Sequence, residues 1–377
     1  MPRRLVLVLA VLLAALAPAL HPVRQAPFGS PVRTTTPPRP AHPDGRFGPL
    51  QRPGPAFSVP GPALAASLTC TPPPSPGLSR NAVLLLSSTG LDSGASFDWN
   101  YEPGLSAAGI TWCTSDARRS NGDINNGDIN NGDIQERAEY VAFALREIRD
   151  RTGRPVDVVG HGQGALVARL VLRFWPELRA AVSDLVELAP PNQGSDAFRA
   201  TCSHACPPAY WQQLPGSMLV DAVNSGQATF PGVDYTVITS AIDDVITPQP
   251  AALALPPGPG RVSAVAVQDV CPDYVADHLG LGGYDAVAWA IAMDALNNPG
   301  PAEPGRVNRS VCGAGFMPAI DGERFLDDSA RAAPVLETVP PEGVPTVPTE
   351  PAPRCWVLAD GCLTGGSSLT GGSSADR

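Results

Sequence analysis

Asp243 and His278, in the second half of the chain, have the types and the order of a general acid–base pair. Asp243 closely follows a β-rich run at 235–239, so its carboxylate is placed just past the end of a strand. A carboxylate in that place can orient a histidine, which then accepts and returns a proton. Of the five histidines, two lie in a Pro-rich segment, one in a glycine turn and one between two cysteines. Only His278 remains downstream of the acid.

A glycine turn at 160–164, Gly-His-Gly-Gln-Gly, precedes this pair in the chain. The β-branched run at 156–159 predicts a buried parallel strand before the turn. Apolar residues at helical spacing predict a helix after it, ending at Pro176. Strand, tight turn and helix match the pattern G-x-S-x-G, whose central serine presents a nucleophilic oxygen at the helix N-terminus. Here the central residue is Gly162, so the frame is intact and the nucleophile is absent. An ordinary glycine-rich turn is the alternative.

The elements that would position these residues alternate between strands and helices. A helix beginning at Asp133 keeps one apolar face, and Asp133 with Glu136 forms a D-x-x-E capping box. A polar loop, Ser87 to Gly90, follows the first strand at an edge where parallel sheets bind ligands. The pattern predicts an α/β fold with a mostly parallel sheet and helices on both faces. The expected strands are 81–86, 110–113, 156–159, 184–189, 235–239 and 261–267.

A pentapeptide is repeated three times at 121–135, as Asn-Gly-Asp-Ile followed by Asn or Gln. It does not fit a calcium-binding loop, because Gly127 stands where an acidic or amide ligand is needed. Three copies are also few for a solenoid. We interpret the repeat as an expanded surface loop.

The two ends of the chain differ in composition from its centre. Residues 1–19 have a basic start, an apolar run and an Ala-Pro-Ala cleavage site, which predict a signal peptide and secretion. Residues 20–66 are rich in Pro, Gly and Arg and are expected to form a disordered spacer. The domain is placed at 67–320, and 321–377 is a C-terminal extension with a Gly/Ser-rich tail.

Composition limits the partners. The net charge is −10, although residues 1–66 carry seven arginines and one acidic residue, so the domain itself is strongly acidic. Such a domain repels nucleic acid and anionic lipid. The apolar run is short for a membrane span, so no stable membrane insertion is expected. The absence of lysine and the Ala, Pro and Gly bias suggest a bacterial source.

Eight cysteines, an even number, fit an exported and oxidised protein, but sequence alone leaves 105 pairings open. Cys202 and Cys206 flank His204, yet no second ligand pair follows at zinc spacing. A local disulfide is therefore favoured over a metal site, and no metal is expected.

These residues together resemble a secreted lipase of the lipase B type, within the α/β-hydrolase superfamily. The similarity runs from about Cys70 to Cys312, with a weaker match at Cys355 and Cys362. The matching stretches are Val83–Leu86 with Thr89-Gly90, Ser96–Asp98, the helix around Ile134–Val141, the glycine turn, Trp211–Gln213, Ser240–Asp243, Pro248-Gln249 and Val275–His278.

The resemblance implies an acid at Asp243, a base at His278 and an oxyanion hole from the backbone N–H groups of Thr89 and Gln163. It implies no cofactor, a lipid or small ester as ligand, and a monomer. It also implies the disulfides Cys70–Cys113, Cys271–Cys312 and Cys355–Cys362, which leaves Cys202–Cys206 as an additional local pair.

Two departures from the family separate the possible functions. The family has serine where this chain has Gly162, and its oxyanion loop reads Pro-Gly-Thr-Gly where this chain has Ser87-Ser88-Thr89-Gly90. Ser87 and Ser88 lie on the opposite loop and are not expected to replace the nucleophile. One interpretation is a catalytically impaired relative that binds an acyl or ester ligand. The alternative is an active secreted lipase or esterase whose Gly162 is a sequencing artefact or an engineered inactivation. A purely structural role has no specific signal.

Overall fold

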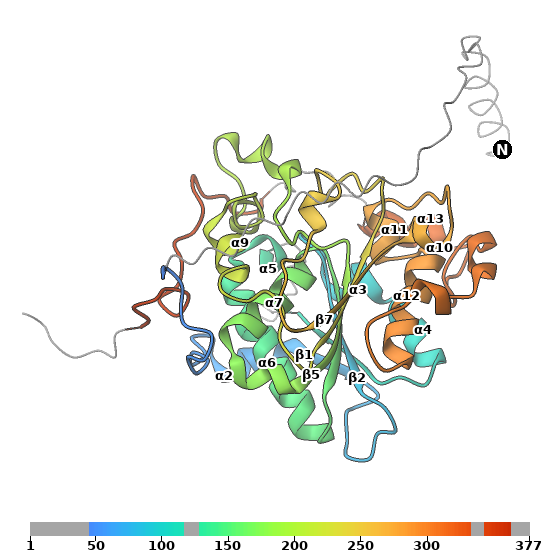
Figure 1. Ribbon diagram of the computed structural model, residues 1–377, viewed down its shortest axis with the longest axis horizontal. Helices are drawn as coiled ribbons and strands as arrows, with labels where there is room; N and C mark the ends of the chain where they lie inside the picture. The colour runs from blue at the N-terminus through green and yellow to red at the C-terminus, as the bar shows by residue number, and fades with distance from the viewer. Residues whose placement is uncertain (1–44, 117–127, 333–342, 363–377) are drawn as a thin grey trace, which may run out of the picture. The chain divides into compact units, whose positions relative to one another are not determined.

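The computed structural model describes residues 45–116, 128–332 and 343–362, and seven strands in it form one sheet (Figure 1). The order is β1-β3-β2-β4-β5-β6-β7, with β1 antiparallel to β3 and every other pair parallel. The predicted strands are all present, and β1 is an addition that the sequence pattern does not indicate. The strands are β1 Leu68–Thr71, β2 Ala82–Leu86, β3 Trp112–Ser115, β4 Val156–His161, β5 Val182–Leu188, β6 Asp234–Thr239 and β7 Arg261–Ala266.

Helices cover both faces of the sheet, which confirms the predicted fold class (Figure 1). Strand β2 shows the reason, because successive side chains of a strand point to opposite faces. Leu84 and Leu86 belong to the core with α6 and α7, whereas Val83 and Leu85 belong to the core with α4 and α12. The helices are α2 Gly61–Ser67, α3 Ser93–Phe97, α4 Tyr101–Ala107, α5 Asp128–Asn131, α6 Ile134–Thr152, α7 Gln163–Phe174, α8 Pro208–Gln212, α9 Met218–Val223, α10 Val267–Val270, α11 His278–Gly282, α12 Ala286–Asn297 and α13 Phe325–Ala332.

Helix α6 begins as the sequence predicts, but its cap is simpler. The Asp133 carboxylate accepts a hydrogen bond from the Gln135 N–H at 3.0 Å. Glu136 does not complete a capping box, since its carboxylate binds Arg354 at 3.1 Å. The predicted apolar face is fully buried, and it consists of Ile134, Ala138, Val141, Leu145 and Ile148.

Four disulfide bonds join parts of the described chain: the three pairs that the resemblance implies and the additional local pair Cys202–Cys206. Cys70–Cys113 joins the antiparallel edge strand β1 to β3, and Cys202–Cys206 closes a loop with a sequence separation of 4. The other two are Cys271–Cys312 and Cys355–Cys362.

Residues 45–59 and 343–362 are more ordered than the sequence suggests. The disordered spacer is predicted to extend to residue 66, yet Phe47 is 7% exposed and pairs with Leu358 in an isolated antiparallel bridge. Trp356 packs against Phe174 and Trp175 at the end of α7, with ring centroids 5.3 and 5.0 Å away. The two segments therefore form a terminal clasp over α7, defined here as residues 45–59 together with 343–362. The expected signal peptide and the Gly/Ser-rich tail after residue 362 lie outside the described residues.

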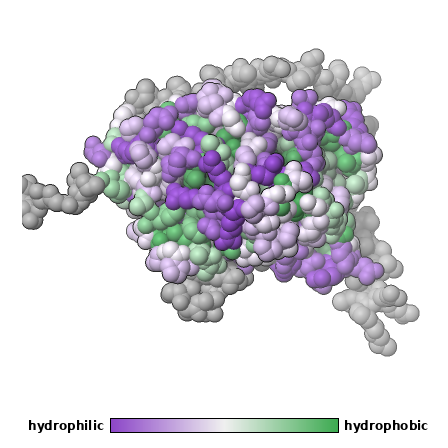
Figure 2. Space-filling model, turned by 90° about the horizontal axis from the view of Figure 1, so that it is seen from below, coloured by the Kyte–Doolittle hydropathy of each residue, from purple (hydrophilic) through white to green (hydrophobic). Residues whose placement is uncertain are grey.

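The outer surface is mixed in character. Figure 2 shows one face, on which hydrophilic residues cross the centre between separate hydrophobic areas. In the part of the chain that the structure covers, no helix combines the length and apolar character of a membrane span.

Candidate active site

The glycine turn lies between β4 and α7 and has the backbone of a strained elbow. Gly162 has φ 51° and ψ −117°, in the region that favours glycine, and its N–H donates to the Leu188 carbonyl at 2.8 Å. The flanking glycines permit close packing. A Cβ at Gly160 would lie 2.5 Å from the Ala165 nitrogen, and one at Gly164 would collide with the Leu86 carbonyl of β2. The turn thus presents residue 162 at the N-terminus of α7.

Asp243 and His278, separated by 35 residues, meet above this turn. His278 Nδ1 donates to Asp243 Oδ2 at 3.0 Å, and the two side chains are 3% and 0% exposed. The other carboxylate oxygen accepts the backbone N–H groups of Val245 and Ile246 at 2.9 and 2.8 Å. Burial alone would raise the pKa of Asp243, but His278 and these hydrogen bonds outweigh it and lower that pKa. The ionised carboxylate holds His278 with its Nε2 available as a base.

His161, inside the turn, supports His278 from the other side. Its Nε2 donates to the His278 carbonyl at 3.1 Å, and the ring centroids lie 4.6 Å apart. Burial, followed by the neighbouring His278, lowers the pKa of His161 to about 3. His161 therefore stays neutral near pH 7. The sequence places it in the turn without indicating a role, because its partner lies 117 positions away.

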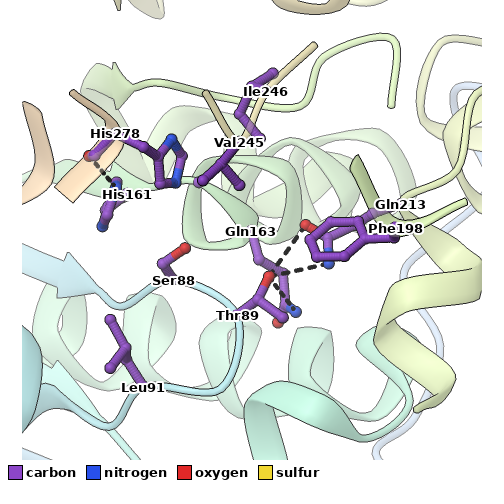
Figure 3. Close-up of a pocket in the computed structure, with 11 residues that line it drawn as sticks. Ser88, Thr89, Leu91, His161, Gln163, Phe198, Gln213, Val245, Ile246 and His278 are labelled. Atoms are coloured by element: carbon purple, nitrogen blue, oxygen red, sulfur yellow. Dashed lines mark hydrogen bonds between the residues drawn. The ribbon is translucent and has the colours of Figure 1, made fainter. Parts of the chain in front are cut away.

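The two expected oxyanion donors, Thr89 and Gln163, line one pocket next to each other, with Gln163 Nε2 3.4 Å from the Thr89 hydroxyl. The eleven residues that line the pocket also include Gly162 and His278 (Figure 3). The backbone N–H groups of Thr89 and Gln163 have no hydrogen-bond acceptor among the described residues. The Thr89 hydroxyl lies 3.0 Å from Gln213 Nε2. The cavity volume is about 20 Å³, which is room for about one water molecule. Only the reacting end of a ligand fits within it.

A buried polar network fixes the loop that carries Thr89. Arg137 of α6 donates to the Gln163 side chain at 2.6 Å and to the Ser87 carbonyl at 2.7 Å. Burial lowers the pKa of Arg137 to about 10, so it remains a cation at neutral pH. Asn130 Nδ2 donates to Ser87 Oγ at 2.9 Å, and the Asn130 carbonyl accepts from Gln163 Nε2 at 2.8 Å. Neither Arg137 nor Asn130 is indicated by the sequence pattern.

Asn130 also corrects the interpretation of the pentapeptide repeat. It is the last residue of the second copy, and it is 1% exposed. The repeat is therefore not only an expanded surface loop, because its end supports the loop at 87–91 from within. Residues 117–127, which hold the first copy, lie outside the described residues.

Ser88 points into the pocket from the same loop (Figure 3). A Cβ placed on Gly162 would collide with Ser88 Oγ and would lie 3.4 Å from His278 Nε2. The serine hydroxyl thus occupies the space that a side chain at residue 162 would fill. The sequence places Ser88 on the opposite loop and does not reveal this overlap.

Comparison with known proteins shows which sequences and folds this chain is similar to. No protein-family model matches the chain. Over 237 residues the sequence is 31% identical to lipase B of Pseudozyma antarctica, covering 60% of this chain and 64% of that protein. The chain thus spans somewhat less than two thirds of that relative's length.

Among solved structures, the lipase B of Aspergillus fumigatus aligns with a TM-score of 0.69 and 25% identity, over 82% of this chain and 74% of that one. A mature lipase of Bacillus licheniformis is more distant, with a TM-score of 0.39 and 17% identity, over 47% of this chain and 72% of that one. The chain has the α/β-hydrolase fold, and its similarity to lipase B makes it lipase-like.

Proposed function

We propose that this lipase-like α/β-hydrolase binds an ester or acyl ligand with its carbonyl group in the pocket over the N-terminus of α7. The observation that carries the proposal is the buried Asp243–His278 pair, whose histidine lines the same small cavity as Thr89 and Gln163. Two unpaired N–H donors and a helix N-terminus suit a carbonyl oxygen that gains negative charge. The 20 Å³ cavity leaves the remainder of the ligand outside.

Catalysis through the glycine turn is impaired in this proposal. Glycine has no oxygen, so an acyl-enzyme cannot form at residue 162. His278 and the two N–H donors retain a route in which water is activated directly. Triads without their serine keep roughly 10³- to 10⁴-fold acceleration over water, far below a working hydrolase.

The alternative, a natural serine at residue 162 changed by error or design, is less well supported. A serine there would meet Ser88 Oγ, so a single change at residue 162 would leave two side chains in one space. The pocket is instead consistent with glycine at 162 and serine at 88 together. The strong negative charge of the domain repels nucleic acid and anionic lipid, so neither is proposed as a partner. Secretion is part of the same proposal, supported by the four disulfides.

Ligand binding is tested with 2-octanone, which has the carbonyl of an ester and no leaving group. Calorimetric titration should show saturable binding to the unmodified protein. Val245→Trp places a large ring at the pocket lining and should weaken binding about tenfold or more, which corresponds to about 1.4 kcal/mol. Val262→Trp is the matched control, since Val262 is 43% exposed on β7 and lies outside the pocket. Equal affinity in both variants, or no saturable binding at all, would contradict the proposal.

A further inference from the structure

We propose that Ser88 is the nucleophile of this site and accepts the acyl group that residue 162 cannot. The inference rests on the proposed function, because it needs an ester carbonyl in the same pocket. It goes beyond that function by giving the chain a covalent route to ester hydrolysis with a serine on the loop that carries Thr89.

The position of the hydroxyl is the first argument. Ser88 Oγ bounds the space above Gly162 on one side, and His278 Nε2 bounds it on the other, 3.4 Å from the point where a Cβ of residue 162 would lie. In the G-x-S-x-G arrangement a nucleophile acts from this space. Ser88 therefore presents an oxygen there from the facing loop, beside the histidine that must take its proton.

The freedom of the hydroxyl is the second argument. Ser87 Oγ is engaged, since it accepts from Asn130 at 2.9 Å and from Arg137 at 3.4 Å. Ser88 Oγ has no hydrogen-bond partner among the described residues, although Ser88 is only 7% exposed. Ser88 Oγ and His278 Nε2 are not hydrogen-bonded to each other here, and catalytic contacts of this kind often tighten only when substrate is bound. A buried serine with an unused hydroxyl beside a base has the surroundings of a nucleophile.

The residue types at these two positions agree with both arguments. The resemblance stated above implies glycine at residue 88 and serine at residue 162, and this chain has serine at residue 88 and glycine at residue 162. The two exchanges are reciprocal, and the overlap explains why, because the space holds one hydroxyl group and not two. Loss of function at residue 162 alone would not require a serine at residue 88.

The reaction balances without any further reactant except water. His278 Nε2 takes the Ser88 Oγ proton while Oγ forms a bond to the ester carbonyl carbon, and the oxyanion is held by the Thr89 and Gln163 N–H groups. The carbon–oxygen bond to the alcohol then breaks, and His278 returns the proton to the leaving alcohol. Water next attacks the acyl-Ser88 ester and gives its proton to His278. His278 then returns this proton to Ser88 Oγ as the Oγ–acyl bond breaks, which releases the carboxylic acid and restores both the serine hydroxyl and the neutral histidine.

The experiment uses diethyl p-nitrophenyl phosphate, which phosphorylates serine nucleophiles, and locates the adduct by peptide mass spectrometry. We expect one adduct on Ser88, absent from Ser88→Ala and from His278→Ala. Hydrolysis of p-nitrophenyl butyrate should fall roughly 10²- to 10⁴-fold in Ser88→Ala. Ser96→Ala is the matched control, since Ser96 is a buried serine whose hydroxyl also lacks a partner among the described residues and which lies outside the pocket. It should keep both labelling and activity.

The outcomes separate this inference from the proposed function. An unlabelled Ser88, or an adduct on another residue, overturns the inference if the protein still binds 2-octanone. Equal esterase activity in Ser88→Ala and the unmodified protein also overturns it, provided that the variant melts at a similar temperature. If 2-octanone binds to no variant and no adduct forms, the proposed function itself has failed.

Discussion

His161 Nε2 donates a hydrogen bond to the carbonyl oxygen of His278, so a residue of the glycine turn holds the backbone of the histidine that pairs with Asp243. The contact requires a proton on His161 Nε2, and burial, which lowers the pKa of His161 to about 3, keeps the ring neutral near pH 7. Gly282 allows it, because a Cβ at that position would collide with the His161 ring. His161 consequently lies against the His278 ring without adding a positive charge of its own near pH 7.

The buried state of His161 predicts a pH dependence of stability. Its folded pKa is about 3, against 6.5 for an ordinary histidine. As the pH falls, the unfolded chain binds this proton first, so the free energy of unfolding decreases between about pH 6.5 and about pH 3. His161→Phe should reduce this slope, measured by urea unfolding at several pH values. His204→Phe replaces an exposed histidine and should leave the slope as it is. Identical slopes in all three proteins would argue against a buried neutral His161.

The shared space of Ser88 and Gly162 predicts that the two positions must be exchanged together. Gly162→Ser alone adds a side chain at φ 51°, which costs about 1–3 kcal/mol, and also displaces Ser88. Gly162→Ser with Ser88→Gly removes the collision, and its hydrolysis of p-nitrophenyl butyrate should exceed that of the single variant by about tenfold or more. In this double variant, diethyl p-nitrophenyl phosphate should label residue 162 instead of residue 88. Ser88→Gly alone has neither hydroxyl and serves as the baseline. If Gly162→Ser alone is as stable and as active as the double variant, the two side chains fit together without a loss of stability, and the prediction is contradicted.

The repeat predicts different effects for removing one copy and two. Deleting residues 121–125 leaves an identical Asn-Gly-Asp-Ile-Asn before the last copy, so the buried asparagine is retained. Deleting 121–130 puts Ser120 in its place and removes the amide that binds Ser87. A lost buried hydrogen bond costs about 1–3 kcal/mol when its partner stays unpaired. Thermal unfolding should therefore change little for the first deletion and clearly for the second. Equal losses would mean that repeat length matters more than Asn130.

The disulfides predict unequal contributions to stability. Cys70–Cys113 closes a separation of 43 residues and Cys202–Cys206 a separation of 4. Chain-entropy arguments give about 4 kcal/mol for the longer loop and about 2 kcal/mol for the shorter. Double replacement by alanine should lower the free energy of unfolding in that order, measured in denaturant under oxidising conditions. A greater loss on removing Cys202–Cys206 would indicate that this bond fixes α8 and the pocket residues near it.

What the sequence predicts well is local. The glycine turn is recognisable because β4 and α7 have distinct hydrophobic periods on either side of it, and α6 shows its buried face at helical spacing. The acid and base follow from residue type and chain order. Arg137 and Asn130 cannot be found in this way, because each acts on residues 26 to 50 positions away and neither breaks a local pattern. The position of Ser88 beside Gly162 cannot be predicted for a similar reason, since the distance between two loops depends on the tertiary fold and not on the sequence of either loop.

The terminal clasp cannot be predicted from the sequence, because a single large side chain in a Pro-rich segment produces no periodic hydrophobic pattern. Phe47 and Trp356 are isolated in stretches without periodicity, yet both are buried. Low average hydrophobicity therefore does not mean disorder in these two segments. Glu350 illustrates the polar contribution, as its carboxylate accepts the Met218 and Leu219 N–H groups at the start of α9.

The clasp also determines when, during synthesis, the end of α7 can become fully buried. Arg52 binds the Leu358 carbonyl, a contact between residues 306 positions apart. A ribosome makes Trp175 long before Trp356, so the part of Phe174 and Trp175 that Trp356 covers stays open until residue 356 has been synthesised. Contacts of this range form slowly and leave apolar surface open to self-association in the meantime. A chain cut between residues 332 and 343 would keep every pocket residue and the 45–59 half of the clasp but would lose Trp356 from the end of α7, and we expect such a fragment to aggregate.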